Sequence, residues 1–255
     1  MTKSLNIILF GETGVGKSSL VNLIAGSEVA QTSGDGDACT MTYRPYSFQV
    51  HGISYTIWDT RGLDEADTTM KAKGYLAAVE QAYKLIQALA AAGGVDLLVL
   101  CHREGRVTST TRSNYRLFYE VLCESNVPIA LAITFLERHA QMEDWWEQNV
   151  GVFERHEMIV AGHACVTGLP GHSKSQESRL AIEDMLGHHD DKGRYTMPPG
   201  QWFPRFLRRW ATFRSGPCPS GLKKGDLEDF LRKRCGLGIR DAHDIADILA
   251  KERDG

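Results

Sequence analysis

A glycine-rich stretch near the amino end contains the residues whose types and spacing are best suited to chemistry. It matches the pattern G-x-x-x-x-G-K-[ST] and runs Gly11-Glu12-Thr13-Gly14-Val15-Gly16-Lys17-Ser18. Glycines let the backbone curl so that successive amides face phosphate oxygens, and the positive end of a following helix adds to the attraction. In such loops the lysine reaches the terminal phosphates and the hydroxyl ligates Mg²⁺. We therefore predict that residues 11–18, together with Ser19, hold nucleotide phosphates, with Lys17 also catalytic and Ser18 a magnesium ligand.

The segments on either side have the patterns that such a loop needs. Residues 5–10 form a short apolar run typical of a buried strand, and residues 18–25 place Leu20, Leu23 and Ile24 on one helical face. A chance match to the loop alone is expected in on the order of one chain in a hundred of this length. The strand before it and the helix after it make a chance match much rarer, which favours a phosphate site.

A second motif follows a predicted hairpin. Residues 43–50 and 53–58 read as two strands joined at His51 and Gly52, and the second strand leads into a D-x-x-G pattern, Asp59-Thr60-Arg61-Gly62. An aspartate at a strand end can hold Mg²⁺ through water, and a glycine amide beyond it can approach the γ-phosphate. We assign the magnesium role to Asp59 and a catalytic, γ-phosphate-sensing role to Gly62.

A small polar loop lies between the two motifs. Residues 27–42 have no periodicity, and such a stretch inside a compact domain is usually a functional loop. Loops that close on a γ-phosphate are how nucleotide switches work. Thr40 is the predicted hydroxyl of this loop, both catalytic and a ligand to Mg²⁺, and its alternatives are Thr42, Thr32 and Ser33.

Composition and charge exclude several classes of function. The chain has 255 residues, a formal net charge of −3 and a pI near 6.3, so no overall positive field indicates a nucleic-acid partner. Six scattered cysteines without a C-x-x-C pair favour a reducing compartment. We see no signal-peptide pattern and no apolar run of membrane-spanning length. We therefore expect a cytoplasmic protein that binds no nucleic acid.

The remainder of the chain alternates strands and helices. Residues 95–101, 128–134 and 162–166 read as buried strands, and helical patterns cover residues 74–94, 114–123, 142–156 and 176–186. The alternation predicts an α/β fold with a mostly parallel central sheet covered on both faces. We expect one domain over residues 1–187, a linker over 188–201 and a helical C-terminal extension over 202–255. The resemblance described below implies that the first is a P-loop G domain, which has the three-layer P-loop NTPase fold.

The extension begins with an amphipathic segment. Residues 202–214 place one set of apolar side chains on one helical face, with arginines largely opposite: Trp202, Phe203, Phe206, Leu207, Trp210 and Phe213. A basic amphipathic helix can lie weakly on a membrane or grip a partner. A large apolar stripe is more often core, so we favour packing of this helix on the G domain.

With these residues placed, the chain resembles translation-factor-like (TRAFAC-class) P-loop GTPases, in particular the branch near septins and immunity-associated GTPases. The resemblance rests on the G-x-T-G-x-G-K-S form of residues 11–18 and on residues 105–108, Gly-Arg-Val-Thr, just after a strand. Residues 114–120, 142–146 and 162–167 look like those of fungal G-domain proteins. The resemblance implies binding of GTP or GDP with Mg²⁺, hydrolysis of GTP and, by analogy, nucleotide-dependent dimers.

The base-recognition end departs from the pattern of that family. G proteins usually carry N/T-K-x-D after the fifth strand, and here the matching residues are Thr134-Phe135-Leu136-Glu137. Glu137 supplies a carboxylate one methylene further out, and the Phe135 ring can stack on a base. The fifth motif, usually S-A-K/L, is matched by Cys165-Val166-Thr167. The resemblance thus assigns base contacts to Thr134, Glu137 and this last triplet.

A second departure concerns hydrolysis. Ras-type proteins place a water-orienting glutamine directly after D-x-x-G, and this chain has Leu63 there, which cannot bond water. We expect slow turnover unless an activating protein or a second copy completes the site; Arg61, Arg103 and Arg106 are loop arginines able to stabilise phosphate charge. Two alternatives stay open, which are a nucleotide-binding scaffold without selected hydrolysis and an ATP-using P-loop protein.

Overall fold

The computed structural model describes residues 4–31, 42–61, 72–187, 194–213 and 222–251. The chain divides into two compact units. The first unit comprises residues 1–36, 43–64 and 95–195, and the second comprises residues 37–42, 65–94 and 196–255.

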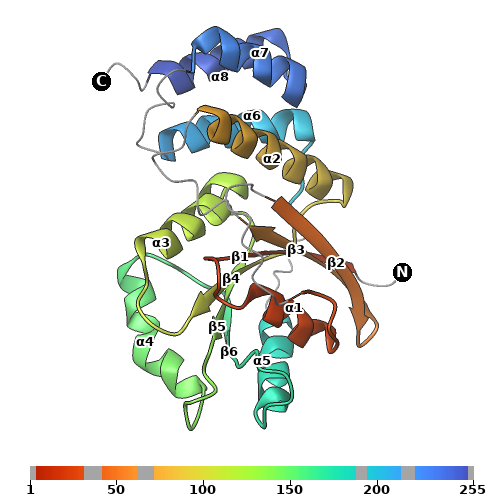
Figure 1. The fold of residues 1–255 in the computed structure, drawn as a ribbon, viewed down its shortest axis with the longest axis vertical. Helices are drawn as coiled ribbons and strands as arrows, with labels where there is room; N and C mark the ends of the chain where they lie inside the picture. Colours follow the sequence, from red (N-terminus) through yellow and green to blue (C-terminus); the bar gives the residue numbers. More distant parts are fainter. Residues whose placement is uncertain (1–3, 32–41, 62–71, 188–193, 214–221, 252–255) are drawn as a thin grey trace. The chain divides into compact units, whose positions relative to one another are not determined.

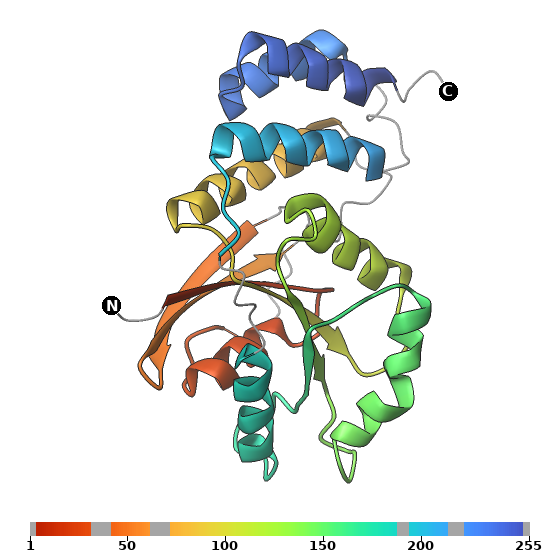
Figure 2. The same cartoon turned by 180° about the vertical axis from the view of Figure 1, so that it is seen from behind.

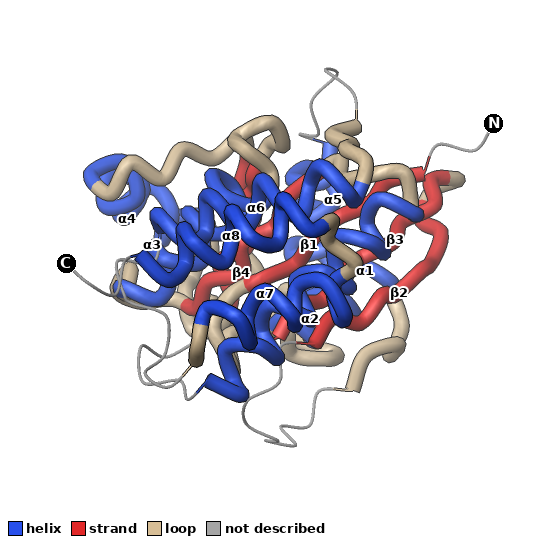
Figure 3. Tube along the Cα trace, turned by 90° about the horizontal axis from the view of Figure 1, so that it is seen from above, coloured by secondary structure: helices blue, strands red, loops and turns tan. Residues whose placement is uncertain are grey.

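A six-stranded sheet is the centre of the first unit (Figure 1). Its strands are β1 (Ser4–Phe10), β2 (Thr42–Val50), β3 (Ile53–Arg61), β4 (Leu97–Arg103), β5 (Ile129–Thr134) and β6 (Gly162–Cys165). Their order is β2-β3-β1-β4-β5-β6, and β4, β1, β3 and β2 can be followed as neighbours in Figure 3. β1 runs parallel to β3 and β4, and β5 runs parallel to β4 and β6. The loops after these strands therefore gather at one edge of the sheet, where α/β proteins bind ligands.

Helices cover both faces of this sheet. They are α1 (Lys17–Ala25), α3 (Ser109–Tyr115), α4 (Glu143–Arg155) and α5 (Ser175–Gly187). Figures 1 and 2 show α1 and α5 on one side, with α3 and α4 on the other. The strands β1, β4 and β5 are almost wholly buried, which explains why they are continuous apolar runs instead of alternating ones. This arrangement confirms the predicted α/β fold with a mostly parallel sheet.

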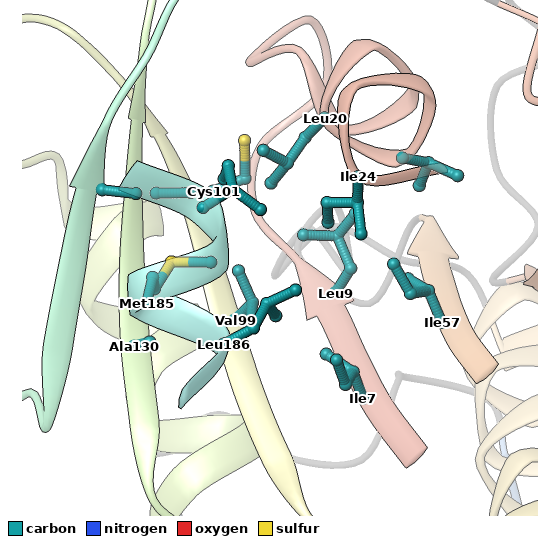
Figure 4. Close-up of a cluster of buried hydrophobic side chains, with 14 of the residues drawn as sticks. Ile7, Leu9, Leu20, Ile24, Ile57, Val99, Cys101, Ala130, Met185 and Leu186 are labelled. Atoms are coloured by element: carbon teal, nitrogen blue, oxygen red, sulfur yellow. The ribbon is translucent and has the colours of Figure 1, made fainter. Parts of the chain in front are cut away.

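The core on the α1 side is built from alternate residues of the strands. Ile7 and Leu9 of β1 pack toward Leu20 and Ile24 of α1 (Figure 4), and the same cluster includes Met185 of α5. On the other face, Phe10 stacks on the ring of Phe118 with centroids 4.2 Å apart. The alternation along β1 thus serves two separate cores, as expected for a strand whose side chains point to opposite faces.

The predicted hairpin is confirmed, because β2 and β3 are joined by His51 and Gly52, with φ of 49° and 77°. Positive φ at both central residues is typical of the tight turn that suits the twist of paired strands. Another prediction needs correction. The helix expected at 114–123 begins earlier, at Ser109, because the Thr108 hydroxyl accepts the Thr111 amide at 2.9 Å and caps it. From Arg116 to Leu122 it continues as a π-helical segment, η1.

The second unit is helical. It consists of α2 (Ala72–Ala91), α6 (Pro199–Phe213), α7 (Lys224–Cys235) and α8 (Ile239–Lys251), and α6 packs against α2 and α8. On the apolar face of α6, five of the predicted side chains are buried: Trp202, Phe203, Phe206, Leu207 and Trp210. Tyr83 of α2 lies 4.9 Å from the Phe203 ring, and Arg208 pairs with Asp241 of α8 at 3.0 Å. These five side chains are therefore part of the core of the second unit, and packing of the extension on the G domain stays a prediction.

The long-range packing groups α2 with the C-terminal helices, whereas the sequence predicts α2 inside a G domain over residues 1–187. The boundaries at 187 and 201 stay predictions. None of the helices in the part of the chain that the structure describes is long and apolar enough to cross a bilayer.

Candidate nucleotide-binding site

The predicted phosphate loop lies between β1 and α1, at the sheet edge where the strand ends gather. Lys17 is buried at the start of α1, and its ammonium donates to the carbonyl oxygens of Gly11 at 2.5 Å and Glu12 at 2.9 Å. The lysine therefore bridges back over the loop. Gly16 is the N-cap residue of helix α1 and supplies no side-chain cap, and the first turn of the helix contains no acidic residue. A helix start of this kind leaves amides and partial positive charge for an anion.

Gly11 has to be glycine at this position. Its φ is 142°, and a methyl group there would lie 2.2 Å from the carbonyl oxygen of Cys101 on β4. The close approach lets the loop start directly against the sheet. Gly14 and Gly16 also have positive φ, of 79° and 92°, but a methyl group on Gly14 would meet nothing within 4 Å. Only Gly11 is therefore fixed by both backbone conformation and space.

The far end of the loop is held through the carbonyl oxygen of Val15. The Thr134 hydroxyl donates to it at 2.7 Å, and the Cys101 thiol at 3.3 Å. Thr134 is buried and its hydroxyl also lies 3.3 Å from the His102 carbonyl. The structure thus gives Thr134, predicted as a base contact, a bond that fixes the loop. Burial raises the pKa of the Cys101 thiol to about 12, so this thiol stays protonated and remains a donor.

Two of the three magnesium candidates, Ser18 and Asp59, lie in the described part of the chain and carry oxygen groups that suit the ion. Asp59 pairs with Leu9 in the parallel register of β1 and β3, which places it beside the strand that leads into the loop. Its side chain is only 2% exposed, and both Lys17 and Asp59 act electrostatically on the Cys101 thiol. Oxygen ligands suit Mg²⁺, and a hydroxyl such as that of Ser18, at the start of α1, together with a carboxylate is a common set. Thr40 and Gly62, like Thr32 and Ser33, lie outside the described residues.

At the base-recognition end, the structure joins two predicted residues. Glu137 accepts the Thr167 hydroxyl at 3.3 Å, and the Thr167 amide donates to the Ser178 hydroxyl at 3.0 Å. Cys165 and Val166 lie in the core, and burial raises the pKa of the Cys165 thiol to about 12. Val166 also pairs through its backbone with Ile133 and Leu136. Of the predicted triplet, only Thr167 therefore meets the carboxylate.

Three contacts around the site had no signal in the predicted motifs. Gly168 approaches α1 so closely that a methyl group there would lie 2.8 Å from the Cβ of Ser19. Arg103 lies over the Phe135 ring, 4.2 Å from its centroid. Gly168, three residues after the end of β6, is the one signal by which the sequence could have indicated such a contact.

The third contact concerns Glu12. Its carboxylate accepts the hydroxyls of both Thr108 and Thr111, the latter at 2.7 Å. Its side chain therefore turns to the start of α3 while its carbonyl holds Lys17. The Gly-Arg-Val-Thr segment at 105–108, noted in the sequence, acquires a structural role, because Thr108 caps α3 and anchors the phosphate loop.

Comparisons with known proteins find a curated relative and solved structures that are similar to this chain. The GTPase Der of Campylobacter curvus is 31% identical over 156 residues, which are 61% of this chain and 31% of that protein. The chain therefore spans about a third of that relative's length. The solved structure of Era with MgGDPNP and part of 16S ribosomal RNA covers 84% of this chain and 68% of its own, with a TM-score of 0.53 and 16% identity. The solved structure of Toc33 from Arabidopsis thaliana covers 76% of this chain and 88% of its own, with a TM-score of 0.50 and 17% identity.

The two structural likenesses show the fold. A family match shows more, because the family described as "50S ribosome-binding GTPase" matches residues 6–134, which include the phosphate loop, Asp59 and Thr134. Its members are GTPases that use GTP or GDP with Mg²⁺. The match ends just before Phe135 and Glu137, where the sequence departs from the usual base motif. The chain therefore belongs to the family of 50S ribosome-binding GTPases and is a GTP-binding protein built on a G domain.

Proposed function

We propose that this chain is a Mg²⁺-dependent guanine-nucleotide switch, or a GTPase that assembles into dimers, with slow hydrolysis of its own. The observation that carries the proposal is the Lys17 ammonium, held by two loop carbonyls at the uncapped start of α1, in the same buried region as Asp59. A cation and the positive end of a helix at one point favour a polyphosphate. We also propose that the protein is located in the cytoplasm, and this part of the proposal rests on the cysteine pattern alone.

The roles follow from position. Lys17 and the loop amides bind the terminal phosphates, and Ser18, Thr40 and Asp59 hold the metal ion. When bound, Mg²⁺ neutralises the charge on the phosphate oxygens. The Gly62 amide senses the γ-phosphate. Glu137, oriented by Thr167, accepts hydrogen bonds from the edge of guanine.

Slow hydrolysis is proposed because Leu63 stands directly after D-x-x-G and has no group that orients water. The group that completes the site then comes from elsewhere, either an activating protein or a second copy. Arg106 supports this, since it is exposed in the loop between β4 and α3 that also binds the phosphate loop through Thr108. The Toc33 structure is described as a dimerization-deficient mutant, R130A, which is a substitution that removes an arginine.

Single-turnover phosphate release with GTP and Mg²⁺ tests the catalytic part. We expect a measurable rate that rises with protein concentration if a second copy contributes, and Arg106→Ala should abolish that rise without changing nucleotide affinity. A rate equal to that of buffer at every protein concentration supports the scaffold alternative instead.

The absence of a nucleic-acid partner also remains a proposal. The net charge of −3 supports it, whereas the family description names ribosome binding and the Era structure contains ribosomal RNA. Filter binding to ribosomal RNA at two salt concentrations decides the question. Affinity that falls steeply with salt contradicts our expectation, because phosphate contacts release counterions.

A further inference from the structure

Phe135 has an unusual backbone conformation. Its φ is 67°, in the left-handed region, which is rare for a bulky side chain. Strain of this kind persists where the surroundings enforce it, and it clusters at ligand-binding positions. Its neighbours are fixed, since Thr134 binds the phosphate loop and the Leu136 amide donates to Val166 at 3.3 Å. These bonds on either side hold the backbone of Phe135 in its conformation, and the backbone in turn sets the direction of the ring.

The ring lies between the phosphate loop and Arg103. A methyl group built on Gly16 would lie 3.6 Å from Cε2 of Phe135, so the ring sits over the start of α1. The Arg103 guanidinium lies 4.2 Å from the ring centroid, within the range of a cation–π contact. The backbone supports this position, because the Glu104 amide donates to the Thr134 carbonyl at 3.0 Å.

The order of the strands shows which residues lie on each side of the Phe135 ring. Arg103 ends β4 and Phe135 follows β5, whereas Glu137 is bound by Thr167, which follows β6. Because β5 lies between β4 and β6, Arg103 approaches from the β4 side. The side toward β6 carries the Glu137 carboxylate and the close contact of Gly168 with Ser19.

We propose that the Phe135 ring, backed by Arg103, is the surface on which the nucleobase stacks, an inference that rests on the nucleotide site proposed above. The ring replaces the lysine usual at this position, and the arginine supplies the positive charge from the next strand. The platform recognises the flat face of a purine and adds affinity to guanine and adenine alike. Discrimination between them is left to Glu137 at the edge of the base.

The test measures dissociation constants of GDP, ADP and tripolyphosphate by calorimetry, with Mg²⁺ present, for wild type and variants. Phe135→Ala should weaken both nucleotides by about 5- to 150-fold, the range of base–aromatic stacking, and leave tripolyphosphate unchanged. Arg103→Ala should weaken both by about 2- to 5-fold, as expected for an exposed cation–π contact. Arg155→Ala, which removes an exposed arginine of α4 that has no role in the proposed site, is the control and should change neither. Glu137→Ala should change the GDP-to-ADP ratio, which Phe135→Ala should not.

Two more variants separate binding from folding. Phe135→Gly removes the ring and relieves the positive φ, so the nucleotide-free protein should melt no lower than wild type while GDP affinity falls as in Phe135→Ala. Phe135→Trp keeps a stacking surface and should retain GDP affinity within about 5-fold. Equal GDP affinity in wild type and Phe135→Gly overturns the inference, as does an equal loss in Phe135→Trp and Phe135→Gly. If wild type binds tripolyphosphate but neither nucleotide, the platform is likewise refuted; if it binds none of the three, the nucleotide site itself fails.

Discussion

Two glycines of the phosphate loop differ in a way that makes a sharp prediction. Gly11 and Gly14 both have positive φ, but only Gly11 faces the sheet, where a methyl group would lie 2.2 Å from the Cys101 carbonyl. At Gly14 nothing lies within 4 Å of that position. The pair therefore separates backbone strain from steric contact within one loop.

The expected magnitudes follow from that difference. Gly14→Ala introduces only the left-handed penalty, about 1–2 kcal/mol of unfolding free energy. Gly11→Ala adds a contact with backbone that cannot turn away, and overpacking typically costs a further 1–3 kcal/mol. Gly11→Ala should thus be the less stable variant by about 1–3 kcal/mol, roughly 2–12 °C in melting temperature for a domain of this size.

Urea unfolding of the nucleotide-free protein measures this directly, because no ligand then masks a loss of stability. The slope of unfolding free energy against urea should match among wild type and both variants, which shows that all three unfold the same structure. Equal stability of Gly11→Ala and Gly14→Ala would refute the reasoning, since it would mean that the approach of Gly11 to β4 does not constrain the loop.

Three further predictions concern buried side chains of β4 and β5 near the phosphate loop. Thr134→Val keeps the shape but removes the donor to the buried Val15 carbonyl, so unfolding free energy should fall by about 1–2 kcal/mol in urea titrations; no change would show that the hydroxyl is dispensable. Burial lowers the pKa of His102 from its ordinary value of about 6.5, so the unfolded chain binds more protons, and the free energy of unfolding should fall as the pH drops below about 6.5. His102→Gln should flatten that part of the profile, and an unchanged slope would contradict the assignment. Burial raises the pKa of the Cys101 thiol to about 12, so this thiol should resist alkylation by iodoacetamide near pH 8 until urea unfolds the protein. Peptide mass spectrometry can follow the alkylated fraction of Cys101.

Local patterns in the sequence were enough to place much of the site. The glycine spacing identified the loop that Lys17 closes, and the apolar run before Asp59 placed that carboxylate at a strand end beside β1. The turn at His51 and Gly52 was likewise readable, because few residues tolerate positive φ at both turn positions. These features depend on residues close together in the chain.

What the sequence did not reveal depends on packing between distant segments. Glu12 is an unremarkable loop residue until α3 brings Thr108 and Thr111 to its carboxylate. The grouping of α2 with the C-terminal helices rests on contacts such as that of Tyr83 with Phe203, more than a hundred residues apart. The resemblance to septin-like and fungal proteins stays a prediction, since the family match establishes the broader class alone.

The central claim is that the phosphate loop binds a guanine nucleotide through Lys17. Calorimetric titration of GDP with Mg²⁺ into wild type, Lys17→Ala and Lys223→Ala tests it, the last being an exposed lysine in the second unit. We predict binding by wild type and Lys223→Ala, with at least a tenfold loss in Lys17→Ala, which corresponds to about 1.4 kcal/mol. Equal affinity of Lys17→Ala and wild type for GDP would contradict the account.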